Sequence, residues 1–458
     1  MKGSAMTTVA EILAGYAYFL CFEELPPAVI HEAKRRVIDS LGCALGAFRE
    51  RPVVAARSLA LERPDPRGAT LLGLDQRCSP EIAAFVNGVM VRSLDYNDTY
   101  LSLEPAHPSD NLSAALAMAE VERKEGKDLM AALVVGYEVQ CRLCDAASLR
   151  ARGWDHVTYG ALSTALVAGK LFSLTVEQMV HALGLAGVAN IALRQTRVGE
   201  LSMWKGCAFA NAARNGLFAA FLAKHGMTGP APLFEGEKGF FKLVSGPFTL
   251  ATLGGRGSPF KILDTYIKAY PAEYHAQTAI EAALELRGQI PSVAEISRIE
   301  IESFDACVEI IAGEPEKWRP ATRETADHSL PYCVAVALVD GEVTLESFSP
   351  ERLSDPKLRE LMRKIQVSRN AELTAQYPEA MPNEIRIELS SGKILEKKVS
   401  HARGHPRNPM TDTQVETKFR RLAERLLPEE RIEEILEALW KLEEISDLGR
   451  LLHLFQVR

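Results

Sequence analysis

The chain has 458 residues, of which 47% are hydrophobic and 25% charged, and its formal net charge is −7. This composition excludes a disordered protein, and the length predicts two domains, with one inserted into the other as one arrangement. The acidic balance without a long basic run argues against nucleic-acid binding. No stretch reaches the roughly 18 uninterrupted apolar residues of a membrane span, and the start of the chain lacks the features of an export signal. We therefore expect a cytoplasmic protein with neither nucleic acid nor membrane as a partner.

From residue 7 to about residue 226, apolar residues recur every three or four positions, which predicts helices almost throughout. The predicted helices span residues 27–47, 80–93, 111–123, 127–149, 161–172, 176–189 and 207–224. Thr175 with Gln178 predicts a capping box. Ser109 and Asp110 are expected to cap the helix that follows them, and Gly226 is expected to end the last helix of this series.

The eight cysteines are scattered along the chain. They indicate buried or free thiols in a reducing compartment. Cys141 and Cys144 form the one close pair, one turn apart inside a predicted helix, and lack the second pair or the histidines that a zinc site needs. We expect them to pack in the core. An iron–sulfur dehydratase that uses these cysteines is the weaker alternative, because the usual cluster spacing is missing.

After an irregular Gly- and Pro-rich connection at residues 226–258, strand patterns begin. Residues 296–304 alternate apolar and polar side chains, and two such runs flank the turn at residues 391–393, which predicts a hairpin. Helical patterns separate these strands, and residues 411–455 return to helix. The prediction is a mainly α protein. Residues 1–265 and 404–458 form a large all-helical domain, and residues 266–403 form a smaller inserted α+β domain.

The most informative segment is residues 94–111 (LDYNDTYLSLEPAHPSDN), which holds Asp95, Thr99 and His107 between two predicted helices. Loops held by rigid helices often carry catalytic groups. His107 precedes a predicted helix start, where free N–H groups and a partial positive charge would attract a carboxylate and favour a neutral imidazole that can act as a base. The alternative is that these polar residues only form caps and turns.

Four further segments carry side chains that could complete a site. His156 precedes a predicted helix, and Lys205 begins a very apolar one, where a cation is unfavourable without an anion nearby. Lys268 and His275 lie at the predicted domain junction, where ligand sites are common. Tyr332 ends the motif DHSLPY inside a helical pattern. The alternatives are a partly buried surface histidine, a solvated lysine, a polar turn and a kinked helix.

Several other catalytic templates are missing from the sequence. There is no phosphate loop, no dinucleotide fingerprint in the right context and no HExxH helix. There is also no nucleophile elbow, and no Ser-His-Asp triad can be assembled. The sequence therefore argues against the enzyme classes that depend on these motifs.

Together, the motifs resemble the MmgE/PrpD family in their order and spacing, from about Val9 to the region of His405. The resemblance is faint in the first helix and strengthens at RRVIDSLGCALG. It implies an all-helical domain formed by N- and C-terminal parts, an α+β domain that acts as a lid, a homodimer, and an enzyme that needs no metal or other cofactor.

The functional positions of the family carry over residue by residue. Asp95 and Thr99 match its Asp-x-x-x-Thr element, His107 matches its His-Pro-Ser element, and His156 matches the histidine that opens the next motif. The remaining matches are the two site lysines and the tyrosine after a His-Ser element, here Lys205, Lys268 and Tyr332. The stretches HPSDN, YPAEYHAQTAIEAA, MWKGCAFANAARNG and ETADHSLPY favour the branch that dehydrates 2-methylcitrate, closest to the MmgE type.

The resemblance thus implies elimination of water from a small polycarboxylate, 2-methylcitrate, with citrate as a further substrate. Lys205 and Lys268 would bind the substrate carboxylate with Thr99 and His275. His107, oriented by Asp95, is the expected acid/base group, and His156, His275 or Tyr332 would protonate the departing hydroxyl. The alternatives are cis-aconitate decarboxylation, iminodisuccinate epimerisation, or a non-catalytic helical binding protein whose motifs lie on unrelated surfaces.

Overall fold

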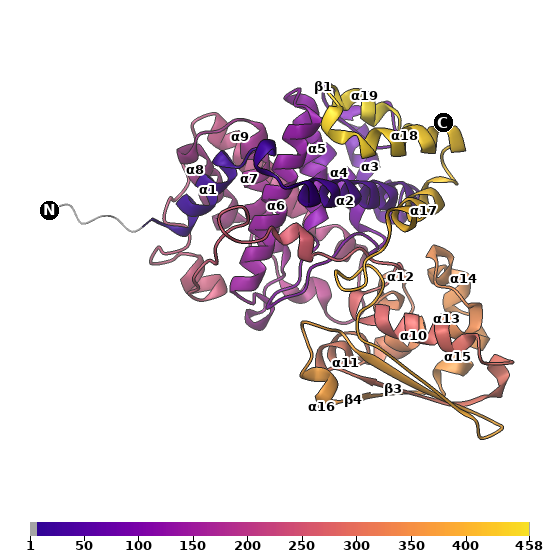
Figure 1. Ribbon diagram of the computed structural model, residues 1–458. Coiled ribbons are helices and arrows are strands. Elements are labelled where there is room, and N and C mark those ends of the chain that lie inside the picture. The colour runs from indigo at the N-terminus through magenta and orange to yellow at the C-terminus, as the bar shows by residue number, and fades with distance from the viewer. Residues whose placement is uncertain (1–6, 458) are drawn as a thin grey trace.

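The computed structural model describes residues 7–457. The expectation of no export signal rests partly on residues 1–6, which lie outside the described residues. The mainly α fold predicted from the sequence is confirmed, with a small part that contains a sheet (Figure 1). The helices of the larger part that precede the insert are α1 (Val9–Phe19), α2 (Pro27–Gly46), α3 (Arg51–Leu61), α4 (Pro80–Arg92), α5 (Leu112–Val121), α6 (Gly126–Ala146), α7 (Val157–Leu171), α8 (Val176–Ala189) and α9 (Ala208–Lys224). None of the helices within residues 7–457 is both long and apolar enough to cross a bilayer.

The C-terminal segment returns to the helical part as α17 (Asp412–Ala423), α18 (Glu429–Trp440) and α19 (Leu448–His453). A capping box of Thr411 and Gln414 starts α17. This helix packs closely on α2, because a Cβ on Gly42 would lie only 3.2 Å from the Cα of Phe419. The last helices therefore share one core with the first ones.

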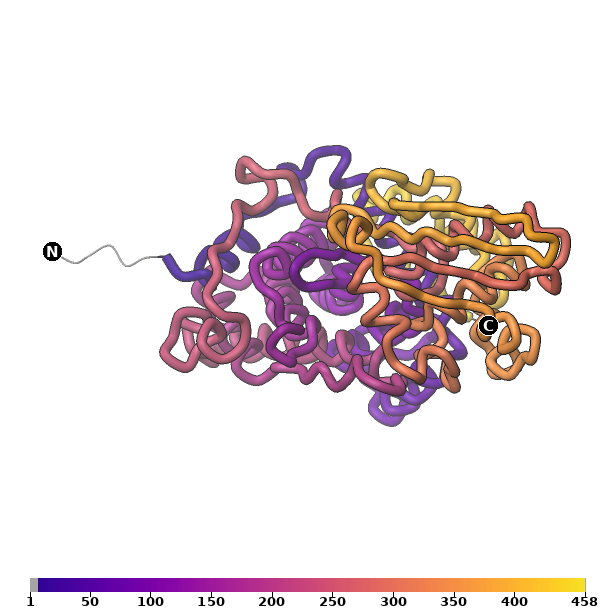
Figure 2. Tube along the Cα trace, turned by 90° about the horizontal axis from the view of Figure 1, so that it is seen from below, coloured from indigo at the N-terminus to yellow at the C-terminus, as the bar shows by residue number. Residues whose placement is uncertain are grey.

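The smaller part holds α10 (Gln277–Arg287), β3 (Ile296–Ser303), α11 (Asp305–Ile311), α12 (Arg323–Ala326), α13 (Leu330–Asp340), α14 (Pro350–Leu353), α15 (Pro356–Met362), β4 (Ile365–Arg369), α16 (Ala371–Thr374), β5 (Asn383–Leu389) and β6 (Ile394–Val399). Its sheet has the order β4-β3-β5-β6, with only β3 and β4 parallel. Inward residues of β3 and β5 pack with α10 and α13 in a second core. Figure 2 shows the long strands of this sheet crossing the near side of the smaller part.

The two segments that join the parts run side by side. Tyr266 exchanges backbone hydrogen bonds with Thr99 in both directions (2.8 and 2.9 Å), and the amide of Ile267 donates to the carbonyl of Gly404 (3.1 Å). Gly404 has a φ of +92°, and a Cβ there would lie 1.8 Å from the carbonyl oxygen of Ile267. This close pairing carries Lys268 from the junction directly to the loop that holds Asp95.

Local predictions had mixed outcomes. The capping box at Thr175 is confirmed, and Cys141 and Cys144 are buried on α6, where burial raises the pKa of both thiols and disfavours their use as thiolate ligands. The predicted caps at Ser109 and Asp110 are wrong. Residues 108–111 form a 3₁₀ turn, and the carboxylate of Asp110 accepts a hydrogen bond from an asparagine side chain.

The short hairpin of β1 (Pro64–Thr70) and β2 (Arg77–Cys78) and the strand β4 were not predicted. The sequence of β1, PDPRGAT, contains two prolines and a glycine, which are depleted in strands. Strand β4 is a short edge strand with mostly polar residues beyond Ile365. The sequence of β1 lacks the alternation that marks a half-buried strand, and β4 alternates only over residues 365–368, directly after a helical pattern that was expected to reach residue 365.

Candidate active site

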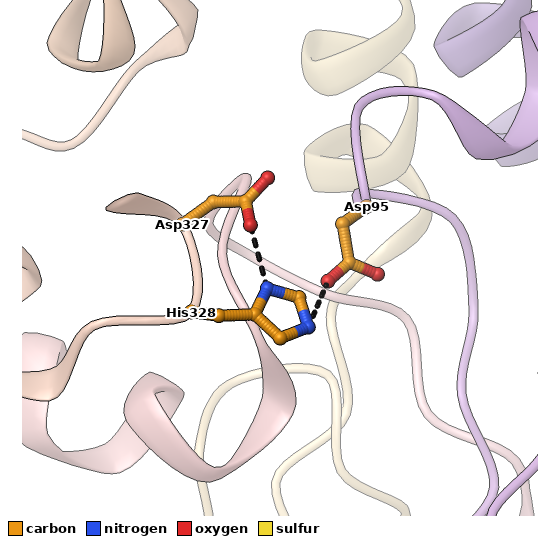
Figure 3. Close-up of side chains that lie close together, drawn as sticks. All are labelled: Asp95, Asp327 and His328. Carbon is orange, nitrogen blue, oxygen red and sulfur yellow. Dashed lines mark hydrogen bonds and ion pairs between the residues drawn. The ribbon is translucent and has the colours of Figure 1, made fainter. Parts of the chain in front are cut away.

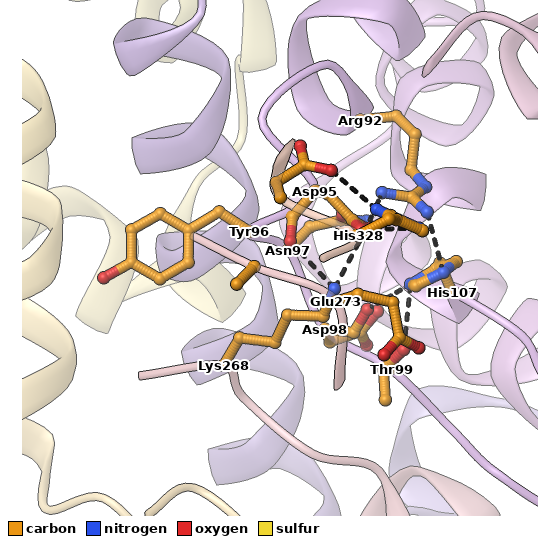
Figure 4. Close-up of polar contacts among 12 residues, drawn as sticks. Arg92, Asp95, Tyr96, Asn97, Asp98, Thr99, His107, Lys268, Glu273 and His328 are labelled. Atoms are coloured by element: carbon orange, nitrogen blue, oxygen red, sulfur yellow. Dashed lines mark hydrogen bonds and ion pairs between the residues drawn. The ribbon is translucent and has the colours of Figure 1, made fainter. Parts of the chain in front are cut away.

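Asp95 lies at the centre of a buried polar cluster, on the loop that follows α4 (Figure 4). Its carboxylate accepts hydrogen bonds from Arg92, from the Nζ of Lys205 (3.2 Å) and from the Nζ of Lys268 (2.9 Å). Burial opposes ionisation of this carboxyl, but the three cations outweigh burial and hold the pKa of Asp95 well below its usual range. Asp95 is therefore a fixed anion that three cations share.

The backbone of Asp95 has a φ of +49°, in the left-handed region that few residues other than glycine adopt. The Nζ of Lys268 donates to the carbonyl of Asp95 as well (2.8 Å), which helps to hold this conformation. Unusual backbone conformations that the surroundings enforce cluster at functional sites. The conformation turns the Asp95 side chain towards both lysines.

The two lysines reach the cluster from separate parts of the chain. Lys205 lies in a 3₁₀ turn just before α9, and Lys268 lies in the segment that leads into the α+β part. Their exposed fractions are 2% and 1%. Burial lowers the pKa of Lys268, with Asp95 opposing that shift. Buried ammonium groups need anionic partners, and Asp95 serves both lysines while Asp327 also contacts Lys205 (3.3 Å).

His107 is held in one tautomer. Its Nε2 lies 2.8 Å from a guanidinium nitrogen of Arg92, and its Nδ1 lies 2.7 Å from the carbonyl oxygen of Asp98. Because a guanidinium only donates, Nε2 must accept, and the proton is on Nδ1. Thr99 adds a contact at Nδ1 (3.0 Å). Burial, Arg92 and Lys268 lower the pKa of His107 well below its usual value, so the ring is neutral near pH 7.

A second neutral histidine lies beside it. The ring centres of His156 and His107 are 5.9 Å apart. Burial lowers the pKa of His156 to about 3. Its Nδ1 faces Asp155 (3.1 Å), and within residues 7–457 its buried Nε2 has no hydrogen-bond partner. Arg197 contacts Asp155 (2.9 Å) and also donates to the carbonyl of Lys205 (3.0 Å), which links this histidine to the cluster.

Asp327 and His328 complete the cluster from the α+β part (Figure 3). The Nδ1 of His328 lies 2.6 Å from Asp327, and its Nε2 lies 3.5 Å from Asp95. Asp95, Asp327 and His328 converge as metal ligands would. The Nζ of Lys205, however, lies 3.2 to 3.3 Å from all three side chains. The cation that these groups contact is therefore an ammonium.

The structure places two predicted site residues outside this hydrogen-bonded cluster. The hydroxyl of Tyr332 donates to the carbonyl of Ser347 (2.7 Å), so its motif contributes His328 to the cluster. The Nδ1 of His275 lies 2.6 Å from Glu273, and its buried Nε2 has no partner among the described residues. Glu273 borders the cluster, since its amide donates to the carbonyl of Asp327 (2.8 Å).

Sequence reasoning missed Arg92 and His328. Arg92 is 3% exposed and bonds to both Asp95 and His107. The sequence feature that could have indicated Arg92 is its place three residues before Asp95, at the end of a predicted helix. Side chains three residues apart on a helical turn lie on one face, so they can form an ion pair. The signal for His328 was its place in the motif from which Tyr332 was chosen.

A cleft of about 1320 Å³ lies between the helical and α+β parts. Tyr96, Met203 and Ala269 line it, and each is one or two residues away from Asp95, Lys205 or Lys268. The side chains of Asp95, Lys205 and Lys268 themselves are almost completely buried. Substrate-sized clefts at domain junctions are common ligand sites. Here the segments that line the cleft are the same ones that carry Asp95, Lys205 and Lys268.

Comparisons with known proteins give the family of the chain. The N-terminal domain model of the MmgE/PrpD family matches residues 11–252, and its C-terminal domain model matches residues 270–442. A 2-methylcitrate dehydratase from Cupriavidus necator is 29% identical over 439 residues, which cover 87% of this chain and 86% of that protein. The 2-methylcitrate dehydratase of Escherichia coli (strain K12) is 29% identical over 439 residues, with 86% of each chain covered.

A relative with another activity in its name is also similar. The cis-aconitate decarboxylase of Mus musculus is 27% identical over 469 residues, which cover 98% of this chain and 94% of that protein. Together the two family models match most of the chain and include Asp95, His107, Lys205 and His328, whereas Lys268 lies in the interval between them. The chain belongs to the MmgE/PrpD family.

Proposed function

We propose that this protein is a metal-independent lyase that removes water from 2-methylcitrate, and from citrate, to give 2-methyl-cis-aconitate and cis-aconitate. The observation that carries the proposal is the neutral His107 in one buried cluster with Lys205 and Lys268. Loss of a proton from carbon beside a carboxylate builds negative charge on that carboxylate. Cations already held in place by Asp95 stabilise such charge without reorganising.

The proposed reaction uses groups of this chain alone. A substrate carboxylate binds Lys205 and Arg92, so that Arg92 releases the Nε2 of His107. Nε2 then takes the proton from the carbon, the electron pair forms the double bond, and the carbon–oxygen bond breaks. The departing hydroxide takes a proton from Lys268, whose pKa burial lowers, and leaves as water. Proton transfer from His107 back to Lys268 restores the starting state.

Four other predicted residues keep roles in this proposal. Thr99 holds the orientation of the His107 ring through its contact at Nδ1. His156 and His275 are the alternative proton carriers, because each has a buried Nε2 without a partner among residues 7–457. Tyr332 is the weakest of the four, since its hydroxyl is engaged with Ser347.

Incubation of purified, chelator-treated protein with 2-methylcitrate, citrate and cis-aconitate, followed by mass spectrometry of the products, tests the proposal. We expect unsaturated tricarboxylates from the first two acids and no loss of carbon dioxide from the third. Chelator treatment should leave the rate unchanged. A protein that converts none of the acids, or one that regains activity only with added metal, would contradict the proposal.

Decarboxylation of cis-aconitate is the second candidate, favoured by the similarity to the mouse enzyme over 98% of this chain. Loss of carbon dioxide leaves a carbanion beside a carboxylate, and the same cations would stabilise it. Carbon dioxide released from cis-aconitate, with no product from 2-methylcitrate, would replace dehydration by this reaction. Epimerisation of iminodisuccinate would instead indicate an epimerase.

We also propose a cytoplasmic homodimer. In support, the segment before Lys205 exposes apolar side chains, with exposed fractions of 60% for Val188, 62% for Leu193 and 45% for Trp204. A second copy of the chain that packs against this segment would bury these side chains. All eight cysteines are unpaired, as expected in a reducing compartment. Light scattering should give twice the mass of one chain, and the mass of a single chain would contradict the dimer.

A further inference from the structure

We infer that Lys418, on α17, is a positioning residue for the active site proposed above, because it bridges the backbones of the two segments that carry Asp95 and Lys268. Its side chain is 4% exposed. The inference rests on the proposed function, since it assigns to a residue outside the reacting groups a part in the same reaction. It concerns a residue from the C-terminal helices, which the sequence did not connect with catalysis.

The ammonium of Lys418 has three polar partners. It donates to the carbonyl of Tyr96 (2.7 Å) and to the carbonyl of Lys268 (2.9 Å), and it lies 2.6 Å from the carboxylate of Asp39 on α2. The two carbonyls accept two of the three protons that an ammonium can donate, and the Asp39 carboxylate balances the charge as an ion pair. The same Nζ lies 3.7 Å from the centre of the Tyr96 ring, a cation–π contact that fixes this side chain as well.

These bonds meet next to the reacting groups. Tyr96 directly follows Asp95, whose backbone has the left-handed conformation. The hydroxyl of Tyr96 donates to the carbonyl of Ala269 (2.8 Å), and the Nζ of Lys268 donates to the carbonyl of Asp95 (2.8 Å). The segments at residues 95–96 and 268–269 are thus hydrogen-bonded directly to each other. Lys418, which lines the cleft, connects them a second time by donating to one carbonyl of each segment. Catalytic groups must be held within about 0.5 Å of their working geometry.

Lys418 has a second, separable role. Asp39 is 1% exposed, and Lys418 is the one cation that contacts its carboxylate within the described part of the chain. Removal of Lys418 alone leaves the buried carboxylate of Asp39 unpaired, which lowers the stability of the protein independently of any effect on the active site. Replacement of both residues by neutral ones, Lys418→Met with Asp39→Asn, removes that charge and leaves the two carbonyls unbridged. The double variant therefore separates positioning from charge balance.

The experiment compares the wild type with Lys418→Met, Asp39→Asn and the double variant. The measurements are the thermal midpoint, kcat and KM for the tricarboxylate that the wild type converts. We expect Lys418→Met to lose both stability and kcat, and the double variant to regain most of the midpoint while kcat stays about tenfold or more below the wild type. The reason is that displacement of a reacting group by roughly 1 Å costs on the order of a hundredfold in rate.

Two further variants sharpen the test. Lys34→Met breaks the ion pair of α2 with Glu443 (2.6 Å), away from the cluster, and should keep the wild-type kcat. Lys418→Gln with Asp39→Asn restores a neutral donor to the carbonyls, and its kcat should exceed that of the Met double variant. Wild-type kcat in the Met double variant would overturn the inference, and so would equal kcat in the Gln and Met double variants.

A failure of the proposed function is distinguishable from a failure of this inference. A wild type that converts none of the acids refutes the proposed function. The same variants are then compared by the affinity for tricarballylate, a tricarboxylate without a hydroxyl, read from the shift in thermal midpoint. The Met double variant should bind it more weakly than the wild type, and equal affinity would overturn the positioning role.

Discussion

At the scale of single residues, the site depends on one carboxylate that keeps three cations in place. Arg92, Lys205 and Lys268 all contact Asp95, and Arg92 also fixes the tautomer of His107. A buried cation without such a partner would lose its charge or leave the interior. The cluster therefore combines a neutral base with positive charge that is held in place, which is what proton removal beside a carboxylate requires.

Replacement of the proposed base gives the first prediction. His107→Ala should lower kcat by roughly two to four orders of magnitude, the usual contribution of general acid–base catalysis. His181→Ala is the matched control, because the Nδ1 of His181 also contacts a carbonyl (3.1 Å), but on α8 outside the cluster. Steady-state kinetics and circular dichroism of both variants provide the check. Near-normal turnover of His107→Ala would remove this residue from the mechanism.

The pH dependence of stability gives a second prediction. Burial lowers the pKa of His156 to about 3, whereas an unfolded histidine titrates near 6.5. Below about pH 6.5 the unfolded chain therefore binds a proton that the folded chain does not, so stability falls as pH falls. Between pH 6.5 and pH 5 this costs roughly 2 kcal/mol for each such histidine.

Urea unfolding at pH 7.5 and at pH 5 measures this effect. In His156→Gln the loss of unfolding free energy over this range should be smaller than in the wild type by roughly the same 2 kcal/mol. His453→Gln, at an exposed position on α19, should leave the dependence as it is. An identical pH dependence in the wild type and in His156→Gln would show that this ring does not titrate as described.

At the scale of the elements, sequence reasoning found most helices and the strands with strong periodicity, because their apolar faces repeat over several turns or residues. It also placed Asp95, Thr99 and His107 on one loop. It chose Tyr332 where the structure brings His328 to Asp95, because the direction of a side chain at the start of α13 depends on how that helix docks. Lys418 was missed for a similar reason, since its carbonyl partners on Tyr96 and Lys268 are set by packing between distant segments.

The pairing of the two joining segments gives a third prediction. Gly404→Ala puts a Cβ 1.8 Å from the carbonyl oxygen of Ile267 and must push these segments apart. Because Lys268 follows Ile267, we expect kcat to fall about tenfold or more along with the thermal midpoint. The matched control is Gly257→Ala, with a φ of +91° and nothing within 4 Å of the added Cβ.

The control isolates the cost of the backbone conformation, about 1–2 kcal/mol for an alanine in the left-handed region. Gly257→Ala should therefore lower the thermal midpoint slightly and leave kcat unchanged. Comparable losses of kcat and stability in the two variants would mean that the contact between the joining segments does not position Lys268.

At the scale of the whole molecule, the cluster draws on both parts of the chain. Asp95, His107 and Lys205 come from the helical part, Lys268 from the junction, and His328 from the part that contains the sheet. A polycarboxylate that binds all of these groups would bind only when the two parts are together. Ligand binding should thus oppose separation and unfolding of the parts.

Tricarballylate tests this coupling without turnover, because it lacks the hydroxyl that the proposed reaction removes. At a concentration one hundred times its Kd, a ligand that binds only the folded state stabilises it by about 2.7 kcal/mol. The thermal midpoint of the wild type should rise accordingly, and that of Lys205→Met should not. Lys224→Met, which removes a surface ion pair with Glu122, should respond as the wild type does. If tricarballylate stabilises Lys205→Met as strongly as the wild type, the anion binds somewhere other than at this cluster, and the carboxylate role of Lys205 is lost.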